Sequence, residues 1–155
     1  MRMNHTMRQA VRMMVGVGLL GLAGCGGTNY AATAQLSGDR EAPPVNTSAS
    51  GTATATLDGN ELTIQGAFSG LSANLYVVSG TSVHVHQGAE STAGGIVFGL
   101  QVTSTDQRSG TFNGTRKLSA EEQNAFRNGL FYVNVHTTAN QGGEIRGQFF
   151  PVPQN

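Results

Sequence analysis

Two short segments of this chain alternate valine with histidine or asparagine, and this alternation constrains the fold more than any other feature. The first segment is 83–86 and the second is 133–136. Successive side chains of an extended strand point to opposite faces, so the valines of each segment share one face and the polar side chains share the other. Valine is the natural core residue. We therefore expect the imidazoles of His84, His86 and His136 together on the outer face of a small sheet, if the two strands are neighbours.

Several other segments have the composition of β-strands and are bounded by residues that favour turns. They are 52–57 and 61–68 with a turn at 58–60 between them, a mostly apolar run at 96–102, a short segment at 111–113, and a last segment at 144–149 with Ile145 facing inward. The first pair predicts a β-hairpin, and the apolar run predicts a buried strand. Short strands separated by glycine, asparagine and aspartate are typical of a β-sandwich or barrel.

One short helix is expected at residues 120–128. Ser119 and Glu122 have the spacing of a capping box, in which each side chain accepts a hydrogen bond from the backbone N–H of the other. Asn128 and Gly129 then provide a stop signal. The helix would pack Phe126 against the sheet, so the sequence predicts an all-β domain with a single short helix.

The start of the chain has the pattern of a bacterial export signal. Three arginines precede an apolar run at 13–23, which is too short to span a bilayer. The run ends in Leu22-Ala23-Gly24-Cys25, which resembles the lipobox, a motif that is cleaved before the cysteine and lipidated on it. We expect residues 1–24 to be removed, Cys25 to carry the lipid, and 25–33 to form a tether. A plain secretory signal with an incidental cysteine is the alternative.

Charge and cysteine content narrow the class of protein. The chain has 9 basic and 9 acidic residues, and three of the basic ones are arginines of the signal, which leaves 6 basic against 9 acidic residues. The chain has no basic patch, so we do not expect it to bind nucleic acid. Cys25 is the only cysteine, so the chain forms no internal disulfide. The remaining length suits one domain, at 34–150, followed by a tail at 151–155.

Several motifs occur together in the order typical of one family. They are Leu36–Gly38 with Glu41–Pro44, Gly70-Leu71, His84–Ala89, Tyr132–Thr137 and Gly143–Gln148. Together they resemble the CHRD domain, first recognised in chordin and common in secreted bacterial proteins. The resemblance covers residues 34–150 and implies an immunoglobulin-like β-sandwich or Greek-key barrel. It implies no particular activity, because the biochemical function of this family is not established.

A second resemblance concerns the histidines alone. The sequence His84-Val85-His86-Gln87, followed by a glycine-containing segment at 91–95, is similar to the copper-binding strand of copper-zinc superoxide dismutases. This resemblance makes His84 and His86 candidate copper ligands, with His136 as a third. The chain has no histidine between Gln87 and Val135, so the bridging and zinc-binding histidines of those enzymes have no counterpart. Their disulfide cysteines are absent as well.

The three histidines therefore have two interpretations. Imidazole suits both copper and zinc, and three imidazoles on one face can hold one ion. Alternatively, they are ordinary polar residues of a sheet face that bond to Asn134, Glu144 or water. Asn134, Glu144 and Arg146 are candidates for orienting a histidine or binding a ligand. For Glu144 and Arg146, however, we prefer the interpretation of an ion pair at the surface or at the end of the barrel, which would fix the C-terminal strand.

The sequence thus predicts a lipid-anchored, non-enzymatic binding module of the cell envelope. We expect a surface histidine site for copper or zinc, a membrane contact through the lipid, and a protein partner in the envelope. Gly26 follows the cysteine, where aspartate would favour the inner membrane, so the outer membrane is the expected location. The alternative is a copper-dependent enzyme of dismutase-like fold. No catalytic residue is predicted, because no serine or cysteine lies in a recognisable nucleophile motif.

Overall fold

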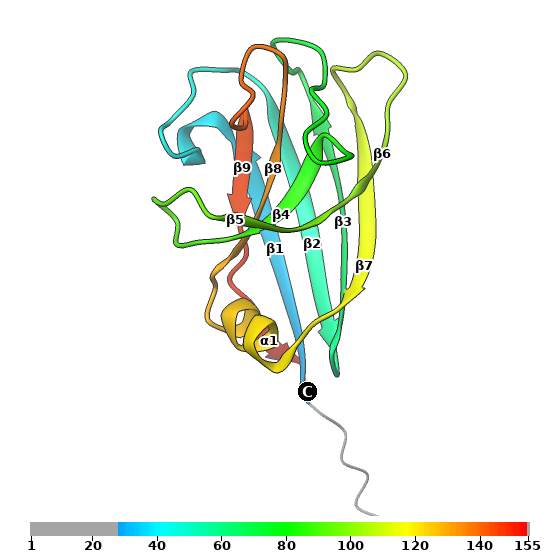
Figure 1. The fold of residues 1–155 in the computed structure, drawn as a ribbon, viewed down its shortest axis with the longest axis vertical. Coiled ribbons are helices and arrows are strands. Elements are labelled where there is room, and N and C mark those ends of the chain that lie inside the picture. The colour runs from blue at the N-terminus through cyan, green and yellow to red at the C-terminus, as the bar shows by residue number, and fades with distance from the viewer. Residues whose placement is uncertain (1–27, 155) are drawn as a thin grey trace, which may run out of the picture.

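The computed structural model describes residues 28–154, so the expected signal segment and Cys25 lie outside the described residues. The described chain folds into ten β-strands, one short 3-10 helix and one α-helix (Figure 1). In chain order these elements are β1 (Asn29–Ser37), η1 (Gly38–Arg40), β2 (Ser50–Asp58), β3 (Glu61–Ser69), β4 (Val83–Gln87), β5 (Gly95–Gly99), β6 (Gln101–Thr103), β7 (Gly110–Lys117), α1 (Ala120–Arg127), β8 (Phe131–Val135), β9 (Ile145–Gln148) and β10 (Val152–Gln154).

The strands form one antiparallel sheet that is nearly closed into a barrel. Its order is β5-β4-β8-β9-β1-β2-β3-β7-β6, and β10 pairs with β1 outside this path. The two end strands, β5 and β6, are consecutive in the chain and are separated only by Leu100. Figure 1 shows the chain passing from β5 across the front of the barrel to β6. The expected all-β class with one short helix is confirmed.

The hairpin of β2 and β3 illustrates how alternation builds the core. Ala55 pairs with Ile64 and Leu57 pairs with Leu62, and all four side chains are buried. The threonines between them on β2 face outward and are exposed. Gly59 has a φ of +57° in the two-residue turn, a conformation that glycine adopts without steric cost. The predicted hairpin is therefore present with the predicted faces.

The helix α1 covers one end of the barrel. Ser119 Oγ accepts a hydrogen bond from the Glu122 N–H at 3.2 Å, and Glu122 Oε2 accepts one from the Ser119 N–H at 2.8 Å. The predicted capping box is thus confirmed. Phe126 is fully buried, and its ring lies 5.8 Å from that of Phe131 and 6.4 Å from that of Phe149. Within residues 28–154, no helix has the length and hydrophobicity needed to cross a membrane.

Two expectations about strands are corrected. The apolar run at 96–102 is not one buried strand, because the chain divides there into β5 and β6 at the two ends of the sheet. Leu100 between them is buried, whereas Ile96 is 43% exposed. In addition, Asn29–Ala31, expected in the tether, pair with Val152–Gln154, expected in the tail. The ordered domain therefore begins earlier and ends later than the sequence suggested.

Candidate metal centre

The two valine–histidine segments lie side by side as β4 and β8. Val85 pairs with Val133, and His84 pairs with Asn134. His136 directly follows β8, and its backbone N–H donates to the carbonyl of Ser82, which directly precedes β4. The valines of both strands are fully buried in the barrel core, as predicted. The polar side chains, including all three imidazoles, consequently share the opposite face.

This opposite face is not exposed, and the expectation of a surface site is wrong. The exposed fractions of His84, His86 and His136 are only 0%, 7% and 4%. The loop at 88–94, between β4 and β5, contacts the ring of His86, and the loop between β8 and β9 contacts the ring of His136. Alternation in a strand determines which face a side chain occupies, but it does not determine whether a loop covers that face.

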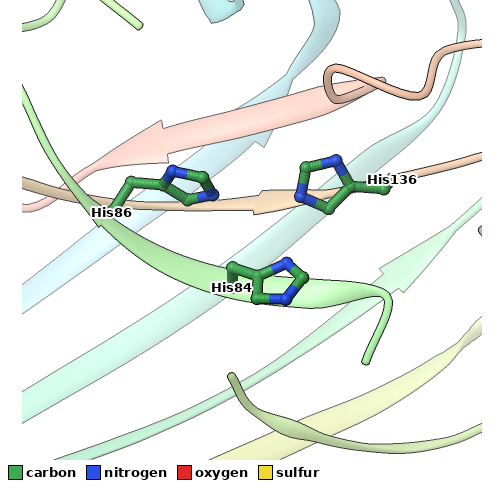
Figure 2. Close-up of side chains that lie close together, drawn as sticks. All are labelled: His84, His86 and His136. Atoms are coloured by element: carbon green, nitrogen blue, oxygen red, sulfur yellow. The ribbon is translucent and has the colours of Figure 1, made fainter. Parts of the chain in front are cut away.

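The three rings converge on one point (Figure 2). The ring centroids of His84 and His136 are 5.0 Å apart, those of His84 and His86 are 5.9 Å apart, and those of His86 and His136 are 6.0 Å apart. One ring nitrogen from each residue lies within 4.8 Å of the other two. The structure therefore brings all three predicted ligand candidates together.

Backbone carbonyls fix the orientation of two of the rings. His86 Nδ1 lies 2.9 Å from the Gly94 carbonyl oxygen, and His136 Nδ1 lies 2.9 Å from the Gln141 carbonyl oxygen. A carbonyl oxygen only accepts hydrogen bonds, so Nδ1 must carry the proton in each ring. In the neutral ring, Nε2 is then unprotonated and free to bind a metal ion.

Four buried ring nitrogens of this cluster have no hydrogen-bond partner among the described residues. They are Nε2 of His86, Nε2 of His136 and both ring nitrogens of His84. A buried polar atom without a partner costs free energy, and native proteins contain few such atoms. The structure therefore gathers four buried, unpartnered ring nitrogens in one cluster.

Burial keeps the three imidazoles in the neutral form that can bind a metal. Loss of solvation lowers the pKa of His84 and the neighbouring His86 lowers it further, while the backbone of Val78 acts in the opposite direction. Burial likewise lowers the pKa of His86, although its hydrogen bond to Gly94 opposes this effect. For His136, burial lowers the pKa to about 4, with the Gln141 hydrogen bond again acting in the opposite direction. All three rings are therefore neutral at neutral pH.

A stack of aromatic and cationic groups supports His86. The ring of Tyr132 lies parallel to that of His86 with centroids 5.0 Å apart, and the guanidinium carbon of Arg146 lies 3.4 Å from the Tyr132 ring centroid. Tyr132 Oη also accepts a hydrogen bond from Gly94 N–H at 2.9 Å, while the Gly94 carbonyl faces His86. Sequence reasoning missed Tyr132, although its position two residues before Asn134 places it on the histidine face.

Arg146 fixes the loop that covers the site. It donates to the carbonyls of Ala89 at 2.7 Å and Thr92 at 3.1 Å, and to the side chain of Gln148 at 2.8 Å. Gln148 in turn donates to the carbonyl of Gly88. These bonds hold both ends of the loop that presents the Gly94 carbonyl to His86, so Arg146 positions a candidate ligand without touching it.

Glu144 and Arg146 do not form the ion pair that we considered. Within residues 28–154, the one salt bridge joins Arg116 to Glu122. Glu144 instead accepts four hydrogen bonds, which come from Thr47, Thr137, and the N–H and hydroxyl of Ser72. Burial alone would raise the pKa of Glu144, but these bonds outweigh it and lower the pKa below the ordinary value. Different loops thus engage the two charged groups separately.

Asn134 and Glu41 complete the polar layer next to the histidines. Asn134 Nδ2 donates to the Gly142 carbonyl at 3.1 Å, and its Oδ1 has no partner in the described chain. Glu41 is 8% exposed with an unpartnered Oε1. Burial raises its pKa to about 7, although the charge of Arg146 acts against this rise. The sequence placed Glu41 in a family motif but gave no reason to assign it to the site.

A separate cavity of about 540 Å³ lies beside this layer. It is lined by residues 39–44, by the loop residues 90–93, and by Arg146 and Gln148. None of the three histidines lines this cavity. The cavity therefore reaches the supporting residues but not the donor nitrogens themselves.

Comparison with known proteins identifies the family. The sequence profile of the CHRD domain matches residues 32–149. A search of curated proteins and a search of solved structures returned no match. The matched region covers more than half of the 155-residue chain and includes β4, β8 and β9, which carry the histidines and their polar neighbours. The chain belongs to the CHRD domain family.

Proposed function

We propose that this CHRD domain is a non-enzymatic module that binds one copper or zinc ion through His84, His86 and His136. One observation carries the proposal: three buried, neutral imidazoles direct unpartnered nitrogens at one point, and two of the rings are oriented through Nδ1 by backbone carbonyls. Histidine ligands in metal sites characteristically donate their second ring N–H to a carbonyl or carboxylate.

The spacing of the donors suits a metal ion after a small adjustment. With metal–nitrogen distances of about 2.0 Å, three nitrogens around one ion lie about 3.4 Å from one another. The nitrogens here lie within 4.8 Å of one another, so side-chain rotations that move each by less than about 1 Å would complete the site. The carbonyl contacts of Gly94 and Gln141 can persist during that movement, because each ring would pivot near its Nδ1.

Burial of the donors favours binding over catalysis. The unpartnered ring nitrogens are shielded from solvent, and the neighbouring cavity is not lined by the histidines. A substrate of a dismutase-like enzyme has to approach an open coordination position on the metal. No observation favours such access here, so the copper-enzyme alternative receives no support.

Metal titration of the purified chain tests the proposal. We would replace Cys25 by serine (Cys25→Ser), since its thiol would bind copper independently. One equivalent of copper or zinc should bind, and His136→Gln should weaken binding by at least 100-fold while the circular dichroism spectrum is unchanged. Gln87→Ala is the matched control, because Gln87 is exposed next to His86. Equal binding by the His136→Gln protein would refute the site.

The same proposal places the domain at the cell envelope with a lipid on Cys25, in the outer membrane where one is present. Its support is the lipobox-like sequence before Cys25. Since β1 begins four residues after Cys25, that residue lies at most about 14 Å from Asn29, so the lipid would hold this end of the barrel near the membrane. Intact-mass analysis of membrane-extracted protein should show an acylated chain that begins at Cys25. An unmodified chain retaining residues 1–24 would contradict this anchor.

A further inference from the structure

We propose that the three-histidine cluster selects the monovalent ion Cu(I) over the divalent ions Zn(II) and Cu(II). This inference rests on the proposed function, because it specifies the ion and the charge state that the same site binds. Four properties of the site favour the monovalent ion. The donors are neutral, they are buried, they number three, and their surroundings add no net negative charge.

The donor set carries no negative charge. Across residues 28–154, the one group of three or more potential metal-binding side chains with convergent donor atoms consists of His84, His86 and His136. It contains neither a carboxylate nor a thiolate. Three neutral imidazoles leave the charge of a bound ion uncompensated, so Zn(II) or Cu(II) would keep two positive charges where Cu(I) keeps one.

Burial makes this difference in charge important. The unpartnered ring nitrogens are inaccessible to solvent, and His84 has an exposed fraction of 0%. The solvation energy of an ion varies with the square of its charge, so transfer from water into this site costs a divalent ion about four times as much as a monovalent one. Coordination by the same three imidazoles must offset that larger cost.

The surroundings do not supply the missing negative charge. Arg146 is 1% exposed, and its guanidinium stacks on Tyr132, which stacks on His86. The buried carboxylate of Glu144 offsets the charge of Arg146, but its two oxygens are engaged by hydroxyl and amide donors. Glu41 is the remaining buried carboxyl of this layer, and burial disfavours its ionised form. The charges of Arg146 and Glu144 offset each other, so neither group supplies a full compensating negative charge to the cluster.

The number of donors points in the same direction. Zinc in structural sites is almost always bound by four ligands, and Cu(II) prefers tetragonal surroundings. Cu(I) has a filled d shell and forms stable complexes with two or three nitrogen donors. The carbonyls of Gly94 and Gln141 face the Nδ1 atoms on the outer side of their rings, so neither adds a fourth ligand at the convergence point.

Competition titrations of residues 25–155 carrying Cys25→Ser, which leave out the expected signal segment and its five methionines, test the selection. Cu(I) would be titrated anaerobically against bicinchoninate, and Zn(II) and Cu(II) against chelators of known affinity. We expect one Cu(I) per chain, bound at least 100-fold more tightly than either divalent ion. X-ray absorption should show three nitrogen neighbours. Ag(I) has the same charge and stays monovalent in air, so it should raise the thermal unfolding temperature as Cu(I) does, whereas Zn(II) should not.

The outcomes separate this inference from the proposed function. Zn(II) or Cu(II) binding as tightly as Cu(I), with affinity that depends on His136, would overturn the selection but leave the metal site in place. An absorption spectrum showing only two nitrogen neighbours would overturn the three-imidazole basis of the selection. Binding of no ion, or Cu(I) binding that His136→Gln leaves unchanged, would overturn both proposals. The comparison of ions uses the unsubstituted histidines, so it remains decisive if the His136→Gln chain fails to fold.

Discussion

Replacing Glu41 by glutamine should make the protein more stable at alkaline pH and leave it nearly unchanged at acidic pH. Glu41 is 8% exposed, and its Oε1 has no hydrogen-bond partner among the described residues. Burial raises its pKa from 4.5 to about 7. The folded protein thus holds this proton more tightly than the unfolded chain, and ionisation of Glu41 opposes folding.

The sign and size of the effect follow from this difference in pKa. Between pH 4.5 and about pH 7, the folded state binds the Glu41 proton and the unfolded state does not, so stability falls as the pH rises through this window. At about 1.4 kcal/mol per pKa unit, the rise corresponds to about 3 kcal/mol lost by pH 8. Glutamine has the same shape and no charge, so Glu41→Gln should recover most of this loss.

Urea unfolding of both proteins at pH 5, 6, 7 and 8, followed by far-ultraviolet circular dichroism, measures the effect. The difference in free energy of unfolding should grow from about 0.8 kcal/mol at pH 5 to about 3 kcal/mol at pH 8. Glu90→Gln is the matched control, because Glu90 lines the same cavity but is exposed. Parallel pH profiles for Glu41→Gln and the unsubstituted protein would refute the argument that burial of this carboxyl opposes folding.

Three further substitutions test the fold and the polar layer. Val135→Ala removes two methyl groups from a fully buried position and should lower the free energy of unfolding by about 2 kcal/mol, seen as a lower urea midpoint. Ser119→Ala removes the cap of α1 and should cost about 1 kcal/mol in the same assay. Glu144→Gln weakens the charge-assisted bonds from Thr47, Ser72 and Thr137 and should cost about 2 kcal/mol at pH 7. This cost should shrink as the pH falls below 4.5, because the unfolded chain then takes up the Glu144 proton more readily than the folded protein.

Local periodicity predicted the parts of the fold that depend on neighbouring residues. Alternation placed Val85 and Val133 inside the barrel and the three histidines on the opposite face. The spacing of Ser119 and Glu122 predicted the helix start, because a capping box is formed within four residues. These predictions succeeded because each signal and the contact it predicts lie close together in the chain or within a single strand.

Contacts between distant segments were not predictable in the same way. The loop that covers His86 is held by Arg146, which donates to a carbonyl 57 residues earlier. Neither the sequence of the loop at 88–94 nor that around Arg146 indicates this hydrogen bond. The histidine face was therefore expected to be exposed. Ile96 was placed in the core for a related reason, since hydrophobicity alone does not reveal that β5 is an end strand of the sheet.

The sheet is buried on both faces where β4, β8 and β9 meet, and this arrangement concentrates the unsatisfied atoms of the molecule. Its inner face is apolar, whereas its outer face carries polar side chains that loops must satisfy. The loops do so for Glu144, Arg146 and Gln148. Of the seven buried side-chain atoms without a partner in residues 28–154, six belong to this outer layer, and four of the six are imidazole nitrogens. The layer thus satisfies its ionised groups but leaves unpartnered nitrogens on three convergent imidazoles, and the proposed metal site rests on this contrast.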